Sequence, residues 1–238
     1  MSAGPASHSA MQSPRSAFAA HVVPFGLFML GLALVPAVQR LGGASEMLLL
    51  AKPAYWIYPL QSLACAVALV AFWKNYDFGA RRPVPLAVGI GLGVFVLWVS
   101  PQLLFGQSPR LAGFDPSVFA AEPTLYAATI AARFLRLVLV VPLVEEIFWR
   151  GFLQRYLIDE RFTTVPFGKY TPLSFWGVAV MFTLVHAMED WPAALVTGAI
   201  YGWIAIRTKS LLACVVAHAT TNLALGLYIM ATRQWGFW

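Results

Sequence analysis

Long apolar segments separated by short polar connections fill the chain from residue 21 onward. A helix that crosses a membrane needs about 20 mostly apolar residues, and seven segments approach that length. They cover residues 21–39, 55–73, 84–100, 125–157, 172–190, 193–208 and 211–231. Apolar residues at 47–53 leave open where the second helix begins, and an eighth helix is also left open. The pattern predicts an all-α, polytopic transmembrane helical bundle of about seven spanning helices.

Proline and polar residues mark the ends of these segments. Pro83, Pro172 and Pro192 stand at predicted helix starts, where proline is tolerated because the first amides have no helical partner. The first 20 residues are rich in Ser, Ala and Pro, and they predict a disordered N-terminal tail. Every connection is too short to fold alone, so we expect one membrane domain.

Composition supports a membrane protein. Hydrophobic residues make up 60% of the 238, and charged residues only 11%, whereas a soluble domain carries about a quarter charged residues. Lys and Arg exceed Asp and Glu by 16 to 10, and we attribute this surplus to topology and to anionic lipid headgroups. No basic tract or zinc-finger spacing is present, so we expect the lipid bilayer as a partner and no nucleic acid.

Three polar clusters interrupt the apolar C-terminal half. They contain Glu145, Glu146 and Arg150, then Phe182 and His186, then His218 and Asn222. A charged side chain at the bilayer centre costs at least about 2.5 kcal/mol. The clusters therefore predict one polar site that is assembled from several helices.

Helical spacing separates the roles of the two adjacent carboxylates. Glu146 and Arg150 are four residues apart, so we expect an ion pair within the helix. Glu145 lies about 100° further round the helix and is free to act as a general base. Trp149 is one turn from Glu145 and is a candidate for the pocket wall. Pro142 predicts a kink just before the acidic pair.

The two other clusters supply hydrogen-bonding groups. His218 and Asn222 are one turn apart, so both can donate to a single oxygen, as an oxyanion site requires. Phe182 and His186 have the same spacing, and Phe182 is a second candidate for the pocket wall. A glutamate and a histidine that converge on one water can deprotonate it, which predicts peptide-bond hydrolysis by an activated water.

The order Glu-Glu-x-x-x-Arg, Phe-x-x-x-His and His-x-x-x-Asn on successive apolar helices resembles the CAAX-protease and bacteriocin-processing family. These are intramembrane proteases related to the type II prenyl endopeptidases. The resemblance covers residues 124–231, which divides the chain into a tail (1–20), N-terminal helices (21–123) and a catalytic core (124–231). It implies that Glu145 and His186 activate the water, that His218 and Asn222 stabilise the oxyanion, and that Glu146 and Arg150 support the site.

A metal is the alternative to a mechanism that uses glutamate alone. Glu145, His186 and His218 would form a set of two histidines and one carboxylate for Zn²⁺. We favour a site without a cofactor, because Asn222 beside His218 is better suited to an oxyanion than to a metal ligand set. Motifs of other intramembrane proteases, such as His-Glu-x-x-His and Gly-x-Ser-x-Gly, are absent from the sequence.

The expected activity is that of an endopeptidase. Its substrate would be a membrane-embedded protein or peptide, membrane-anchored or lipidated, that is cut near its C-terminus. The composition and the lack of a eukaryotic targeting signal favour a multi-pass protein of the bacterial inner membrane. A non-proteolytic scaffold or immunity protein of the same family is left open as the alternative, and Glu145→Gln distinguishes the two because only a protease needs that carboxylate.

Overall fold

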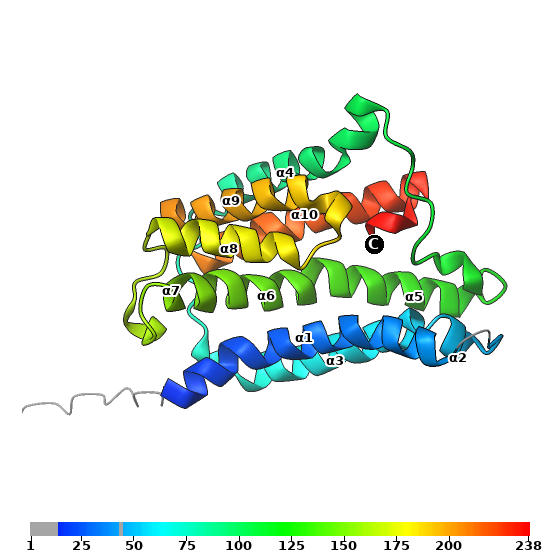
Figure 1. The fold of residues 1–238 in the computed structure, drawn as a ribbon, viewed down its shortest axis with the longest axis horizontal. Helices are drawn as coiled ribbons and strands as arrows, with labels where there is room; N and C mark the ends of the chain where they lie inside the picture. Colours follow the sequence, from blue (N-terminus) through cyan, green and yellow to red (C-terminus); the bar gives the residue numbers. More distant parts are fainter. Residues whose placement is uncertain (1–13, 43–44) are drawn as a thin grey trace, which may run out of the picture.

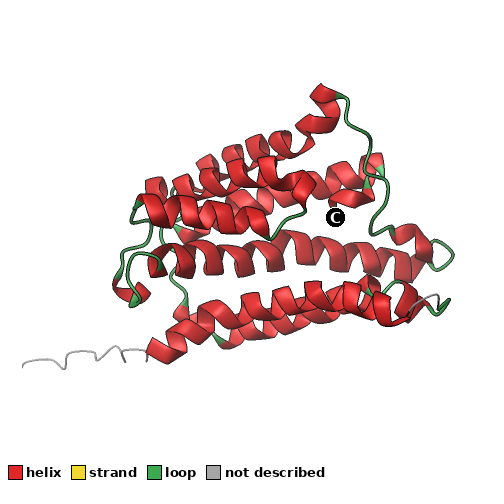
Figure 2. Ribbon diagram, in the orientation of Figure 1, coloured by secondary structure: helices red, strands yellow, loops and turns green. Residues whose placement is uncertain are grey.

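The computed structural model describes residues 14–42 and 45–238, which form a bundle of helices without a β-strand (Figure 2). The α-helices are α1 (Pro14–Gly42), α2 (Leu48–Ala51), α3 (Ala54–Ala71), α4 (Val84–Phe105), α5 (Pro123–Leu135), α6 (Val141–Glu146), α7 (Gln154–Tyr156), α8 (Pro172–Leu184), α9 (Trp191–Thr208) and α10 (Leu211–Thr232). Two π-helical segments, η3 (Arg136–Val140) and η4 (Ile147–Leu153), join α5, α6 and α7. The remaining short helices are the 3₁₀ turns η1 (Trp73–Asn75), η2 (Pro116–Phe119), η5 (Phe162–Thr164), η6 (Met188–Asp190) and η7 (Trp235–Phe237). The prediction of an all-α bundle is confirmed.

One long rod runs through the middle of the molecule. It spans Pro123–Tyr156 and consists of α5, η3, α6, η4 and α7 without interruption. The pair α1 and α3 packs on one side of this rod, and α4, α8, α9 and α10 lie on the other (Figure 1). The rod contacts α1 through η4, and it contacts α10 through η3 and α6. Side chains on opposite faces of the rod therefore enter different environments.

Five helices are long and apolar enough to cross a membrane. They are Arg15–Gly42, Ala54–Ala71, Val84–Phe105, the rod Pro123–Tyr156 and Leu211–Thr232. Their outward faces are apolar, with Leu63 and Val70 exposed by 61% and 74%, as expected for contact with lipid. These features establish a multi-pass membrane protein.

The fifth and sixth predicted spans are helices but do not belong to this set. In the structure α8 stops at Leu184 rather than at residue 190, so its 13 residues are only about 20 Å long. The chain turns there because Ala187 is extended and Trp191 donates its indole proton to the carbonyl of His186 (3.2 Å). α8 and α9 pack against each other as a hairpin (Figure 1), and His186 lies in the turn between them.

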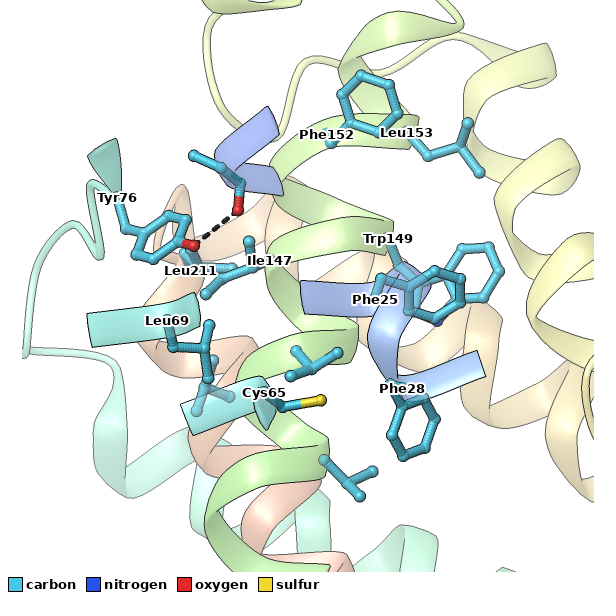
Figure 3. Close-up of a cluster of buried hydrophobic side chains, with 14 of the residues drawn as sticks. Phe25, Phe28, Cys65, Leu69, Tyr76, Ile147, Trp149, Phe152, Leu153 and Leu211 are labelled. Carbon is cyan, nitrogen blue, oxygen red and sulfur yellow. Dashed lines mark hydrogen bonds between the residues drawn. The ribbon is translucent and has the colours of Figure 1, made fainter. Parts of the chain in front are cut away.

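The first helix begins at Pro14 and not at residue 21, so the prediction of a disordered tail is wrong for residues 14–20. Tertiary contacts explain the difference. Tyr76 donates a hydrogen bond to the carbonyl of Ala20 (2.6 Å), and Ala20 is fully buried (Figure 3). Polarity alone cannot reveal such packing. Residues 1–13 of the predicted tail lie outside the described part of the chain.

Pro142 shapes the rod, but through a π-helical turn rather than through a kink alone. Proline has no amide proton and its ring collides with the carbonyl four residues earlier. The preceding segment widens into η3, in which the amide of Val141 bonds to the carbonyl of Arg136, five residues back. The next such bond would need an amide on Pro142, so the carbonyl of Leu137 has no donor within the helix. This carbonyl is available to another helix.

Candidate active site

Glu146 is the centre of a buried polar cluster. Its side chain is fully buried, and its Oε1 accepts hydrogen bonds from Arg150 Nη1 (3.0 Å) and from His218 Nδ1 (2.9 Å). The expected ion pair between Glu146 and Arg150 is therefore present, and the bond from His218 connects it to α10. A carboxylate oxygen that accepts two such bonds is held in a fixed position between the rod and α10.

Arg150 ties this cluster to the α8–α9 hairpin. Its Nη2 donates to the carbonyl of Gly198 (3.1 Å), and its guanidinium lies 5.2 Å from the ring of Phe182 and 5.5 Å from the ring of Tyr201. Gly198 also lets α8 pack closely on α9, since a Cβ there would lie 3.1 Å from Cα of Ala179. The arginine thus fixes the rod, α8 and α9 relative to one another.

Glu145 points away from this cluster. It is 7% exposed, and its Oε2 makes no hydrogen bond within the described part of the chain. It lines a cavity of about 310 Å³ together with His186, His218 and Asn222. The four residues predicted to be catalytic, from the rod, the α8–α9 turn and α10, therefore face one cavity.

The two histidines have different partners. His186 Nδ1 lies 2.7 Å from the carbonyl of Phe182, which can only accept, so Nδ1 carries the proton and Nε2 has the free lone pair in the neutral ring. His218 Nδ1 faces the carboxylate of Glu146 (2.9 Å). In both rings Nδ1 is engaged by the protein, which leaves Nε2 for a ligand in the cavity.

Asn222 has a structural bond that the sequence did not reveal. Its Nδ2 donates to the carbonyl of Leu137 (2.9 Å), the same carbonyl that Pro142 leaves without a donor in the rod. One amide proton of Asn222 is therefore committed to the π-helical turn. Its second amide proton is the one that remains for a ligand in the cavity, which Asn222 also lines.

Phe182 lines the cavity as expected, whereas Trp149 does not. Trp149 is 2% exposed and packs edge-on against Phe25 of α1, with the ring centroids 5.1 Å apart (Figure 3). The π-helical segment η4 explains the difference, because its wider turn changes the angle between successive side chains. The spacing of four residues from Glu145 then directs Trp149 toward α1 rather than into the cavity.

Sequence reasoning missed several residues that complete the cavity. Arg110, in the connection between α4 and α5, reaches Glu189 (2.5 Å) and Asp190 (2.8 Å) at the mouth. Further lining residues are Trp98, Tyr201, Thr221, Phe237 and Trp238. The pairing of Arg110 with two acidic residues 79 and 80 positions away has no local signature. The one indication in the sequence was that Arg110, Glu189 and Asp190 are charged residues in otherwise apolar surroundings.

The alternative of a metal concerns Glu145, His186 and His218. Among the described residues, no group of three or more His, Cys, Asp or Glu side chains that could hold a metal ion is found. His218 Nδ1 faces Glu146 and His186 Nδ1 faces a carbonyl, which leaves Nε2 of both rings without a protein partner. A site that works without a cofactor therefore stays a prediction.

Comparisons with known proteins agree with this geometry. Residues 127–224 match the model of the type II CAAX prenyl endopeptidase Rce1-like family. No curated protein and no solved structure matched the chain. The matched segment contains every residue of the three polar clusters and ends two residues after Asn222. Over this segment the chain is similar to the Rce1-like family of type II CAAX prenyl endopeptidases.

Proposed function

We propose that this protein hydrolyses a peptide bond near the C-terminus of a membrane-anchored or lipidated protein or peptide, with a water activated by Glu145. One observation carries the proposal. Of two adjacent carboxylates, Glu146 holds Arg150 and His218 through its Oε1, while Glu145 forms no ion pair or side-chain hydrogen bond in the described structure and borders the cavity. An acceptor kept free at a cavity is what a general base needs.

Glu145 and His186 are the groups that would act on the water. A water between them would donate one proton to the Glu145 carboxylate and one hydrogen bond to His186 Nε2. Its oxygen would then attack the carbonyl carbon of the substrate. His186 is oriented for this by Phe182, which accepts from its Nδ1 and packs on its ring (centroids 4.6 Å apart).

His218 and Asn222 would stabilise the negative oxygen that forms in this attack. His218, which Glu146 holds at Nδ1, would donate from Nε2 to the oxyanion, and the second amide proton of Asn222 would add another donor. Breakdown then cleaves the C–N bond, and the proton held by Glu145 passes to the leaving amine. The mechanism requires no cofactor, and we expect activity to survive chelation of zinc.

The surroundings of the cavity favour a membrane-bound substrate. Apolar side chains such as Leu137, Val141 and Leu225 form much of its wall. A peptide that is already in the bilayer can enter such a cavity without crossing water. We propose the bacterial inner membrane as the location, and the five long apolar helices support a membrane location in general.

The decisive experiment compares cells that express the wild type, Glu145→Gln and a control variant. Glu160→Gln is a suitable control, because Glu160 is an exposed carboxylate in the loop after α7. Mass spectrometry of membrane-protein C-termini should find shortened products with the wild type and the control, but about 10²–10⁴-fold less with Glu145→Gln. Equal amounts of the three proteins must be shown by immunoblot.

The opposite result has a clear meaning. If the C-termini are identical in all three strains at equal expression, the protein is not a protease under these conditions, and the scaffold or immunity function takes its place. A parallel assay of the purified protein with and without a zinc chelator tests the mechanism separately. Loss of cleavage on chelation, and its return with Zn²⁺, would contradict a mechanism that depends on glutamate alone.

A further inference from the structure

Two buried arginines on the rod lie outside the catalytic cluster. Arg133 and Arg136 are 4% and 6% exposed, one helical turn apart. Neither forms an ion pair with a carboxylate in the described part of the chain, and Nε and Nη1 of Arg133 have no hydrogen-bond partner there. Buried cations without a counter-charge are costly, so this arrangement indicates a missing anion.

Aromatic rings hold both guanidinium groups. Arg133 lies 4.8 Å from the ring of Phe114 and 5.0 Å from that of Tyr58, while Arg136 lies 4.3 Å from Tyr58. Arg136 Nε also donates to Gln61 Oε1 (3.0 Å). Stacked rings orient the guanidinium planes but supply no negative charge. The two groups are thus positioned, but no carboxylate of the described residues lies at ion-pair distance from them.

A cavity of about 250 Å³ opens beside these arginines. Its wall contains both guanidinium groups, the aromatic residues Tyr55, Tyr58 and Phe114, and small or apolar residues of α3 and α5. No Asp or Glu belongs to this wall. Leu125, which belongs to this wall, is 46% exposed. The cavity therefore combines two guanidinium groups with an exposed apolar residue, Leu125, in its wall.

The depth of the cavity corresponds to the headgroup region. Tyr55 and Tyr58 lie in the first two turns of α3, and tyrosines are enriched where a membrane meets water. The rod has 34 residues and is about 51 Å long, well beyond an apolar layer of about 30 Å. Its N-terminal turns can therefore extend past the hydrocarbon, which brings Arg133 close to the interface.

This cavity is separate from the catalytic one. The two share no lining residue, and they lie on different faces of the rod. Arg136 faces Gln61 on α3, whereas the carbonyl of its neighbour Leu137 faces Asn222 on α10. A ligand bound at the arginines would therefore touch η3, the π-helical turn that holds Asn222, from its other side.

We propose that Arg133 and Arg136 bind a phosphate group, carried by an anionic phospholipid or free in solution. Planar guanidinium groups pair with phosphate oxygens through parallel hydrogen bonds, and a phosphate offers enough oxygens for two arginines. The apolar edge at Leu125 gives room for the first carbons of an acyl chain. Binding here compensates both charges at once.

The test uses the full-length protein in lipid nanodiscs and in detergent. Native mass spectrometry should find one tightly held phosphatidylglycerol on the wild type, with affinity reduced at least ~10-fold in Arg133→Met. Arg161→Gln is the matched control, because it removes an arginine whose side chain is 81% exposed. Inorganic phosphate, added to the delipidated protein, distinguishes a free anion from a headgroup. Saturable binding of either probe that is lost in Arg133→Met and retained in Arg161→Gln supports the site.

Thermal unfolding separates ligand binding from a purely structural role. Without lipid or phosphate, Arg133→Met should unfold at the same temperature as the wild type or higher, because an uncompensated charge is gone. With phosphatidylglycerol, the wild type should gain stability and the variant should not. Destabilisation of Arg133→Met by the same amount in both conditions, or equal lipid binding by wild type and variant, would overturn the proposal. Competition by a peptide carboxylate but not by either phosphate would overturn it too and would assign the arginines to the substrate.

Discussion

The rod carries two buried clusters of charge that differ in how their charges are balanced. At Glu146, the protein supplies a counter-charge, because the Oε1 of Glu146 joins Arg150 and His218, while its Oε2 accepts no hydrogen bond from the described residues. At Arg133 and Arg136, about three turns earlier, two cations share aromatic rings and an amide but no carboxylate. The same helix thus holds one cluster whose charge has an ion-pair partner, here termed saturated, and one whose cations have none, here termed unsaturated.

The difference shows how a membrane protein uses buried charge. Saturation fixes geometry, so the Glu146 cluster is suited to orient His218 and to join three helices. A group left unsaturated at a cavity is a group that can act on something else, which applies both to Glu145 and to the paired arginines. Loss of one partner should therefore be most harmful in the saturated cluster.

The largest effect is expected for Glu146→Ala. The substitution leaves the guanidinium of Arg150 buried without its counter-charge, which costs about 3–5 kcal/mol of unfolding free energy. We expect lower abundance in membranes, a lower midpoint of thermal unfolding in detergent and no cleavage. Arg150→Ala should behave similarly, since it leaves the carboxylate of Glu146 unpaired on that side.

Glu145→Gln is the matched control for this prediction. It changes the adjacent carboxylate, which has no ion pair in the described structure, so it should abolish cleavage without lowering abundance. Normal amounts of folded Glu146→Ala protein would mean that the saturated cluster does not hold the helices together. The contrast between the two clusters would then be lost.

A second prediction compares the two arginines of the unsaturated cluster. Arg136→Met should give a protein less stable than Arg133→Met by about 1–3 kcal/mol, because it leaves the buried Oε1 of Gln61 without its donor. Arg133 has no such bond to lose. Unfolding of the two variants side by side in lipid-free detergent measures the difference. Equal stability would show that the bond to Gln61 contributes nothing.

Much of the fold followed from hydrophobic pattern, because a helix in lipid must satisfy its own backbone and so needs a long apolar run. All seven predicted segments are helices in the described chain. The pattern failed where tertiary contacts decide the boundary. The contact of Tyr76 with Ala20 extends α1 beyond its prediction, and the turn at His186 shortens α8.

The sequence predicted which residues belong to the candidate site, but it did not predict the hydrogen bonds that connect them. Charges within an apolar segment identified Glu145, Glu146 and His218, and spacing within one helix identified the pair with Arg150. The bond between His218 and Glu146 joins residues 72 positions apart, which no local pattern encodes. The π-helical segments were also missed, although Pro142 was a signal for the first of them.

The link between Pro142 and Asn222 gives a third prediction. Asn222→Ala should cost about 1 kcal/mol in stability, in addition to its effect on catalysis, because the carbonyl of Leu137 loses its donor. Pro142→Ala restores an amide proton to the rod at the required position. In the Pro142→Ala background, Asn222→Ala should therefore cost less, and a double-mutant cycle measures the coupling. Additive effects would show that the asparagine does not serve the π-helical turn.

The smallest effects are expected at a third charged cluster, which lies at the mouth of the cavity. Arg110 pairs there with Glu189 and Asp190, whose side chains are 70% and 18% exposed. Burial lowers the pKa of Arg110, but its hydrogen bonds to Asp190 and Glu189 outweigh this and raise it. The guanidinium thus stays charged at any working pH, and the same residue bonds through its backbone to Gln234 and Gly236.

Exposure should limit what this third cluster contributes, because water already solvates part of each charge. We expect Arg110→Gln to lower stability by less than about 1 kcal/mol and to act mainly on substrate entry, with KM changed more than kcat. Asp190→Asn should have a larger effect than Glu189→Gln, since the aspartate is the more buried of the two partners. Kinetics with a cleaved membrane peptide and thermal unfolding of the three variants test both points. A loss as large as that of Glu146→Ala would show that completeness of pairing, and not burial, sets the cost of breaking a charged cluster in this protein.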